Sequence, residues 1–178
     1  MVKILQGLSK AIRNFLLNFP NLLGNYFMAR ALSSKDTGKV KCTITLTKGR
    51  FRTKIRDQAI SKKFISKGWQ SQPPVFDEAN DPAAKMDFLK ERIGIEVGFG
   101  HSSFIGIDLL KFQVASYSSL DKIDVGVYVV TTHNFQIKIM KEYKQNWEGS
   151  LSFEKVVRYL PHFKSAIQLP IYVLGIDV

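Results

Sequence analysis

The spacing of hydrophobic residues along the chain predicts helices that alternate with apolar strands. Near the start, apolar residues recur every three or four positions and predict a helix over residues 3–19, which Pro20 ends. Residues 21–35 predict a second short helical or irregular piece, and turn-forming residues follow at 32–38. Closely spaced β-branched residues over 40–47 then predict a strand.

The second half of the chain continues this alternation. A helix over about 57–67 ends at Gly68, a residue typical of helix C-caps. Later elements are a proline-containing loop at 71–84, a strand at 92–99, a helix at 103–116, a strand at 124–131, a polar loop at 131–134, a helix at 151–163 and a strand at 170–176. One side of the helix at 103–116 carries Phe104, Ile107, Leu110 and Val114. The pattern predicts an α/β or α+β domain with a central mixed β-sheet flanked by helices.

The strand at 92–99 contains an acidic residue among apolar ones. Alternation places Glu96 on one face between Gly94 and Gly98, so we expect open space around its carboxylate. The opposite face belongs to the core and carries Ile93, Ile95, Val97 and Phe99. A charge within such a strand requires a partner or a metal ion.

A second carboxylate precedes this strand. With a two-residue turn at Glu91 and Arg92, the two arms form a hairpin that sets Asp87 opposite Glu96, with Cβ atoms roughly 4.5–5.5 Å apart. Two such carboxylates could hold one Mg²⁺ together with waters and phosphate oxygens. The alternative interpretation is that both are ordinary surface charges.

Length, charge and cysteine content limit the number of domains and the classes of partner that we expect. The chain has 178 residues, which suits one domain over 1–178. A net charge of +11 and a pI near 9.8 favour a polyanionic partner, with nucleic acid ahead of an acidic membrane surface. Cys42 is the single cysteine, which excludes an internal disulfide and a cysteine-based zinc cluster. No apolar run near the start is long enough for a signal peptide or a membrane span, so we expect a soluble cytoplasmic protein, with an organelle transit peptide as the lesser alternative.

Basic residues crowd the segment from 39 to 67, where Asp57 is the one acid. We expect this segment to contact DNA or RNA, although a solvated charged face is the simpler alternative. The DNA contacts that we predict here are Arg50, Arg52 and Lys54. The loop after the strand at 124–131 adds further candidates for base or phosphate contacts, again with a solvated loop as the alternative: Thr132, His133, Asn134 and Lys138.

The region around the carboxylates resembles a known family. The residues that carry the resemblance are Gly68-Trp69, Pro74-Val-Phe76, Asp87-Phe88 with Lys90, Ile95-Glu96-Val97 with Phe99-Gly100, and Asp108-Leu-Leu-Lys-Phe112 in the following helix. Together they resemble the PD-(D/E)xK nuclease core and, more narrowly, type II restriction endonucleases of the BglII/BstYI type. The resemblance is strongest over about 60–131 and implies a catalytic core at about 57–131.

The resemblance implies a homodimer that surrounds double-stranded DNA and cuts it by Mg²⁺-assisted hydrolysis, as part of a restriction–modification system. Asp87 would be the main metal ligand, the backbone carbonyl of Val97 a second, and Glu96 a ligand or water-orienting group. It also implies a short palindromic site centred on GATC, and no small-molecule cofactor. His101 and Ser102 lie where the scissile phosphate would be, although His101 also fits a surface turn and the serines fit a helix cap.

Gly98 departs from the family pattern, which places Lys, Glu or Gln at this third motif position. Glycine has no side chain with which to position the attacking water. Either the nuclease is weakened or inactive, or a neighbour such as His101 or Ser102 takes the role. If glycine is the defect, Gly98→Glu should raise Mg²⁺-dependent cleavage and leave the affinity for DNA nearly unchanged.

Two residues of the helix that follows the motif carry opposite charges. Asp108 and Lys111 fit an intrahelical or a dimer-interface pair, and a catalytic role for Lys111 is the less favoured interpretation. Two other functions stay open for the whole chain. One is a non-catalytic basic nucleic-acid-binding domain whose hairpin carboxylates are structural, and the other is a ribosome-associated or membrane-surface protein.

Overall fold

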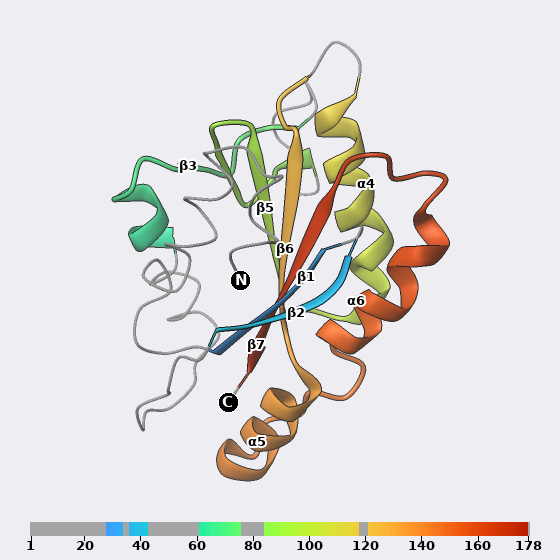
Figure 1. Ribbon diagram of the computed structural model, residues 1–178. Helices are drawn as coiled ribbons and strands as arrows, with labels where there is room; N and C mark the ends of the chain where they lie inside the picture. Colours follow the sequence, from blue (N-terminus) through green and yellow to red (C-terminus); the bar gives the residue numbers. More distant parts are fainter. Residues whose placement is uncertain (1–27, 34–35, 43–60, 76–83, 118–120, 178) are drawn as a thin grey trace.

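The computed structural model describes residues 28–33, 36–42, 61–75, 84–117 and 121–177, the first two ranges as backbone only. Within these ranges seven strands form one mixed sheet in the order β2-β1-β7-β6-β5-β4-β3 (Figure 1). The strands are β1 (Met28–Ser33), β2 (Asp36–Cys42), β3 (Gln70–Ser71), β4 (Phe88–Lys90), β5 (Ile93–Gly98), β6 (Val125–Thr131) and β7 (Ile171–Asp177). β5, β6 and β7 run parallel, and the other neighbours pair antiparallel.

Helices cover both faces of this sheet. The described helical segments are residues 61–65, η2 (Ser102–Phe104), α4 (Ile105–Ser116), α5 (His133–Tyr143), α6 (Phe153–Tyr159) and η3 (Leu160–Phe163). α4 and α6 lie on the same side of the strands (Figure 1), and they pack in one core cluster with the strand residues that face them. α5 contributes Phe135 and Ile139 to a second cluster on the opposite face. Among the described helices, none is long and apolar enough to cross a membrane.

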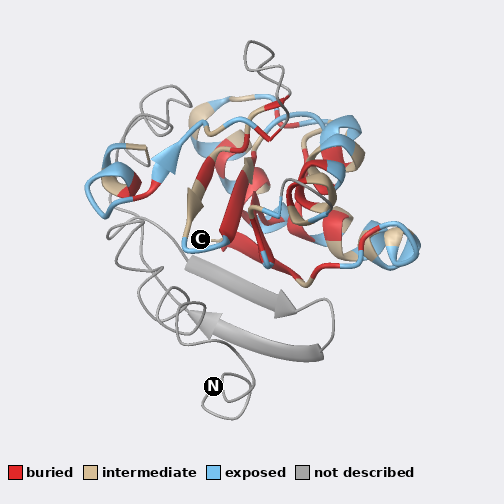
Figure 2. Cartoon of the chain, turned by 90° about the horizontal axis from the view of Figure 1, so that it is seen from above, coloured by how far each residue is buried: buried red, intermediate tan, exposed pale blue. Residues whose placement is uncertain are grey.

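The three parallel strands form the buried centre of the molecule. Almost every residue of β5, β6 and β7 is buried, and these strands stand out as the red centre of Figure 2. Ile93 and Ile95 belong to the α5 side of the sheet, and Val97 and Phe99 pack against the same cluster. The predicted division of the strand into two faces is therefore confirmed.

The prediction for residues 28–38 is wrong. This part was expected to be helical or irregular and then a turn, but residues 28–33 form β1 and Asp36 begins β2. β1 pairs antiparallel with β7 along its whole length, from Met28 opposite Asp177 to Ser33 opposite Tyr172. The partner strand β7 lies some 140 residues later, so the local sequence around β1 does not reveal this pairing. Here tertiary contacts outweigh the local preference of the residues. The helix predicted at 3–19 lies outside the described residues, as does the part of the predicted strand beyond Cys42.

The polar loop predicted at 131–134 is the start of a helix. Thr132 is the N-cap of α5, because its hydroxyl accepts a hydrogen bond from the backbone N–H of Phe135 at 3.1 Å. Phe135 and Ile139 then anchor the helix in the core. The capping threonine was available in the sequence as a signal for a helix start.

Most other predicted elements are confirmed. α4, β6 and β7 match their predicted ranges within one or two residues, and α6 with η3 fills the predicted helix at 151–163. The described part of the helix at 57–67 is helical over 61–65 and ends at Gly68, whose positive φ of 79° is the expected left-handed C-terminal conformation.

Helix α4 turns an unexpected side to the sheet. Its core residues are Ile105, Leu109, Lys111, Phe112 and Ala115. Of the apolar stripe seen in the sequence, Phe104, Ile107 and Leu110 are each about half exposed, whereas Val114 packs against the core cluster. Tyr117 at the end of the helix is also exposed. α4 is thus apolar on two sides, and its outer side has no described partner.

Candidate active site

The hairpin of β4 and β5 has the predicted register. Phe88 pairs with Ile95 and Lys90 with Ile93. Glu91 and Arg92 form the two-residue turn, both with positive φ (48° and 64°), as in the type I′ turns that close tight hairpins. One step beyond the last pair, this register sets Asp87 opposite Glu96.

Asp87 is held at both oxygens. The backbone N–H of Val97 donates to Oδ2 at 2.7 Å, and the Gln72 side-chain amide donates to Oδ1 at 2.9 Å. Each carboxylate oxygen has a second lone pair, so both can still bind a cation. The backbone N–H and C=O of a strand residue point to the same side, so the carbonyl of Val97 also faces the side where Asp87 lies.

Glu96 is buried, contrary to the expected open space. It is 3% exposed, because Met86 and Ile123 fill the space above Gly94, and Tyr128 and Leu151 fill the space above Gly98. The Lys111 ammonium on α4 donates to Glu96 Oε2 at 2.9 Å. No described group donates a hydrogen bond to the other oxygen, Oε1, which is also buried.

Two further residues complete a polar network behind Glu96. Lys111 Nζ lies 3.5 Å from Asp108 Oδ1, so the predicted intrahelical pair is present. The Tyr128 hydroxyl donates to Asp108 Oδ2 at 2.6 Å. Tyr128 pairs with Glu96 in the parallel register of β5 and β6. Strands β5 and β6 and helix α4 therefore hold the Glu96–Lys111–Asp108–Tyr128 network together.

Burial shifts the pKa values of this network. Burial, and then the charge of Asp87, raise the pKa of Glu96 to about 8, although Lys111 opposes the shift. Burial also raises the pKa of Asp87, against the hydrogen bond from Val97. Burial alone would lower the pKa of Lys111, but the carboxylates of Glu96, Asp108 and Asp87 outweigh it and raise the pKa. The site therefore keeps a positive charge at Lys111, and burial disfavours the carboxylate form of Glu96 more than it would at the surface, a cost that a bound cation would offset.

The donor set fits a small hard cation. In the described part of the chain, no three His, Cys, Asp or Glu side chains converge as a metal cluster. Mg²⁺ does not need three, since it is usually held by one or two carboxylates, with waters and phosphate oxygens completing its shell. The unpaired oxygen of Glu96 is a buried polar atom that a cation would satisfy, and Asp87 is the second carboxylate.

Three of the predicted DNA contacts, His101, Ser102 and Thr132, make hydrogen bonds within the protein, and of these Thr132 is buried and His101 is exposed. His101 Nδ1 accepts from the backbone N–H of Ser103 at 3.2 Å, so the histidine caps η2, a role predicted for the serines. The backbone N–H of Ser102 donates to Gly149, and its side chain is partly buried. Thr132 is 1% exposed, and its hydroxyl donates to Asp177 Oδ1 at 2.6 Å as well as capping α5. A buried hydroxyl with both partners inside the protein is not free for a base or a phosphate.

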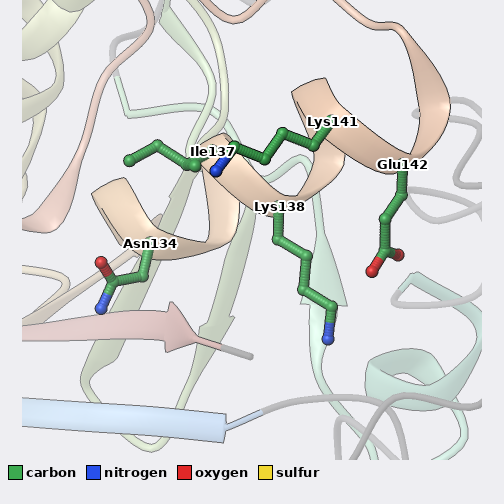
Figure 3. A pocket seen from close by; sticks show the side chains of 5 residues that line it. All are labelled: Asn134, Ile137, Lys138, Lys141 and Glu142. Atoms are coloured by element: carbon green, nitrogen blue, oxygen red, sulfur yellow. The ribbon is translucent and has the colours of Figure 1, made fainter.

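His133, Asn134 and Lys138 are exposed. Asn134 and Lys138 line a surface pocket on α5 with Ile137, Lys141 and Glu142, and Figure 3 shows these side chains projecting from the helix. They follow the carboxyl end of β6, next to the strand that carries Glu96. Arg50, Arg52 and Lys54 lie outside the described residues.

Comparison with known proteins shows which family the chain resembles. The family model described as "Restriction endonuclease BglII/BglIII" matches residues 28–176. A structure of restriction endonuclease BglII complexed with a DNA 16-mer is 18% identical with a TM-score of 0.56, covering 72% of this chain and 57% of that one. A structure of free BglII is 17% identical with a TM-score of 0.51, covering 72% and 60%. The chain thus spans less than two thirds of these relatives, and no curated protein sequence matches it.

Proposed function

Because the chain belongs to the BglII/BglIII restriction endonuclease family, we propose that it hydrolyses phosphodiester bonds of double-stranded DNA as a type II, Mg²⁺-dependent endonuclease. The family match agrees with the resemblance seen in the sequence, and the fold is that of BglII. The observation that carries the proposal is the β4–β5 hairpin. It brings Asp87 beside a buried Glu96, one oxygen of which has no hydrogen-bond partner among the described residues.

Asp87, Glu96 and the carbonyl of Val97 would hold the metal ion. Bound Mg²⁺ would lower the pKa of a water molecule and neutralise charge that develops on the attacked phosphate. Gln72 and the N–H of Val97 fix the Asp87 carboxylate in one orientation. Lys111 fixes one oxygen of Glu96, and the surrounding apolar side chains keep bulk water away from that carboxylate.

Gly98 need not mean that the enzyme is disabled. A side chain at this position would collide with Tyr128 and Leu151, so the glycine fits its surroundings. Whether cleavage is impaired depends on whether another group acts in place of the third motif side chain. Cleavage by the unmodified chain decides between an active and an impaired enzyme.

Double-stranded DNA is the proposed substrate. The net charge of +11 favours a phosphate backbone, and one BglII structure holds a DNA 16-mer. On the described surface, Lys138 and Lys141 carry exposed charge on α5, where Asn134 could contact a base. The family resemblance extends the proposal to a short palindromic site centred on GATC.

A homodimer is the proposed assembly, formed through the outer side of α4. Phe104, Ile107, Leu110 and Tyr117 are 48–63% exposed along this helix. Aromatic side chains such as Phe104 and Tyr117 are enriched in the centres of protein interfaces. A dimer would bring two sites to the two strands of a duplex.

The experiment is digestion of methylation-free plasmid DNA by the chain, with Mg²⁺ and with a chelator, followed by mapping of the ends. We expect Mg²⁺-dependent cuts at a short palindromic sequence. One observation supports the alternative of a non-catalytic DNA-binding domain: the ion pair of Glu96 with Lys111 gives the carboxylate a structural partner. Sequence-selective DNA binding without cuts in Mg²⁺ would support that alternative.

A further inference from the structure

Lys111 reaches the hairpin carboxylates from another element. Its side chain is 10% exposed on the inner side of α4, and Nζ lies 2.9 Å from Glu96 Oε2. Lys85 O lies 3.4 Å away and Asp108 Oδ1 3.5 Å away. Lysine is rarely buried to this extent unless it is paired. The ammonium therefore has acceptors on three sides within the site.

Stability alone does not explain this ion pair. An apolar pair of similar size often stabilises a core as well as a buried ion pair does, because both charges must lose their water. Glu96 and Lys111 nevertheless lie in the apolar layer between α4 and β5, next to Leu109 and Phe112. Their position beside Asp87 points to a role in the site.

The strand itself cannot supply a cation here. A Cβ at Gly98 would lie 2.7 Å from Leu151 Cδ2 and 2.8 Å from Tyr128 Cε2. The Tyr128 hydroxyl occupies that space and donates to Asp108. Lys111 approaches the same Glu96 carboxylate from the helix and leaves Oε1 without a partner in the described part of the chain.

We propose that Lys111 is a positioning residue of the active site. It supplies a cationic group from α4, because Gly98 has no side chain that could carry one. It holds Glu96 through Oε2, so that Oε1 is the oxygen available to a cation shared with Asp87. Asp108, fixed by Tyr128, keeps the ammonium in place. This inference rests on the proposed endonuclease function.

The first test compares Lys111→Met with Lys122→Met under single-turnover conditions on duplex DNA with Mg²⁺. Lys122 is the matched control, because its Nζ also bonds a backbone carbonyl, that of Pro74, and its loss removes the same charge. We expect Lys111→Met to slow the chemical step on the order of 100-fold. The dissociation constant for DNA should change no more than it does in Lys122→Met, and Lys111→Arg should retain more of the rate.

The second test uses the native protein and does not depend on cleavage. Mn²⁺ is added to protein with ¹³C-labelled lysine, and the ε-methylene signal of Lys111, identified by its loss in Lys111→Arg, is followed by NMR. We expect Mn²⁺ to broaden this signal before that of the exposed Lys164. Asp87→Ala should abolish the selective broadening.

The outcomes separate this inference from the proposed function. If the native chain cuts DNA and Lys111→Met cuts as fast as Lys122→Met, the role of Lys111 is overturned. If the native chain does not cut, the endonuclease proposal fails, and selective broadening by Mn²⁺ still supports Lys111 as part of a metal site. If Lys111→Met does not fold, the Mn²⁺ result decides, and the absence of selective broadening contradicts the inference.

Discussion

The space above Gly98 is filled by two side chains, and this decides what a substitution there can do. Sequence alone predicts that Gly98→Glu restores a missing group. In the structure a Cβ at this position would lie within 3 Å of Tyr128 and Leu151. We therefore expect Gly98→Glu to destabilise the protein, since it forces a longer, charged side chain into a buried site.

Gly98→Ala tests this packing in its simplest form. We expect a loss of about 1–3 kcal/mol in the free energy of unfolding, the usual range for overpacking. Urea denaturation measures it, and Gly106→Ala on α4 is the control, because a Cβ there meets nothing within 4 Å. If Gly98→Ala is as stable as the control, the space above Gly98 is not filled as described.

Glu96 predicts a pH dependence of stability. Its pKa is raised from 4.5 to about 8 in the folded protein, so the folded state binds a proton more tightly than the unfolded state does. The resulting stabilisation is complete below pH 4.5 and is lost as the pH rises through about 8. Without metal, we expect the melting temperature, relative to that of Glu96→Gln, to fall between about pH 5 and pH 8.5. A difference that rises over this range would contradict the assignment.

Helix α4 is apolar on two sides. Its inner side carries Lys111 to the site, and its outer side exposes Ile107 and Leu110. We expect Leu110→Glu to convert a dimer to monomers, because it buries a charge in an apolar contact. Light scattering measures the mass, and Ser165→Glu, which adds the same charge at an exposed position, should leave the dimer intact. A dimer that persists in Leu110→Glu is not formed through this face.

The hairpin was predictable because its signals are local. Alternation fixed the faces of β5, and the two-residue turn fixed the register that sets Asp87 opposite Glu96. The contact of Lys111 with Glu96 was not predictable in this way, because 15 residues and a change from strand to helix separate them. The two apolar sides of α4 were equally ambiguous, since spacing alone does not say which side meets the sheet. β1 was missed for a similar reason, as its partner β7 lies at the other end of the chain.

In the whole molecule, the residues of the proposed site come from neighbouring elements around β5 and β6. Asp87 and Glu96 lie on the β4–β5 hairpin, Lys111 comes from α4, and Asn134 and Lys138 follow β6 on α5. The family match over residues 28–176 places the chain in the BglII/BglIII restriction endonuclease family. We propose that the hairpin carboxylates hold the metal ion required for DNA cleavage.

The most direct test is the single-turnover rate of DNA cleavage in Mg²⁺ by the native chain, Asp87→Asn and Asp121→Asn. Asp121 is the matched control, because it is an exposed aspartate whose carboxylate pairs with Arg92 outside the site. We expect Asp87→Asn to slow cleavage by at least about 100-fold, as when a charged group of the site is removed. We also expect Asp121→Asn to cut at the native rate. Equal Mg²⁺-dependent cleavage by the native chain and Asp87→Asn would contradict the proposal.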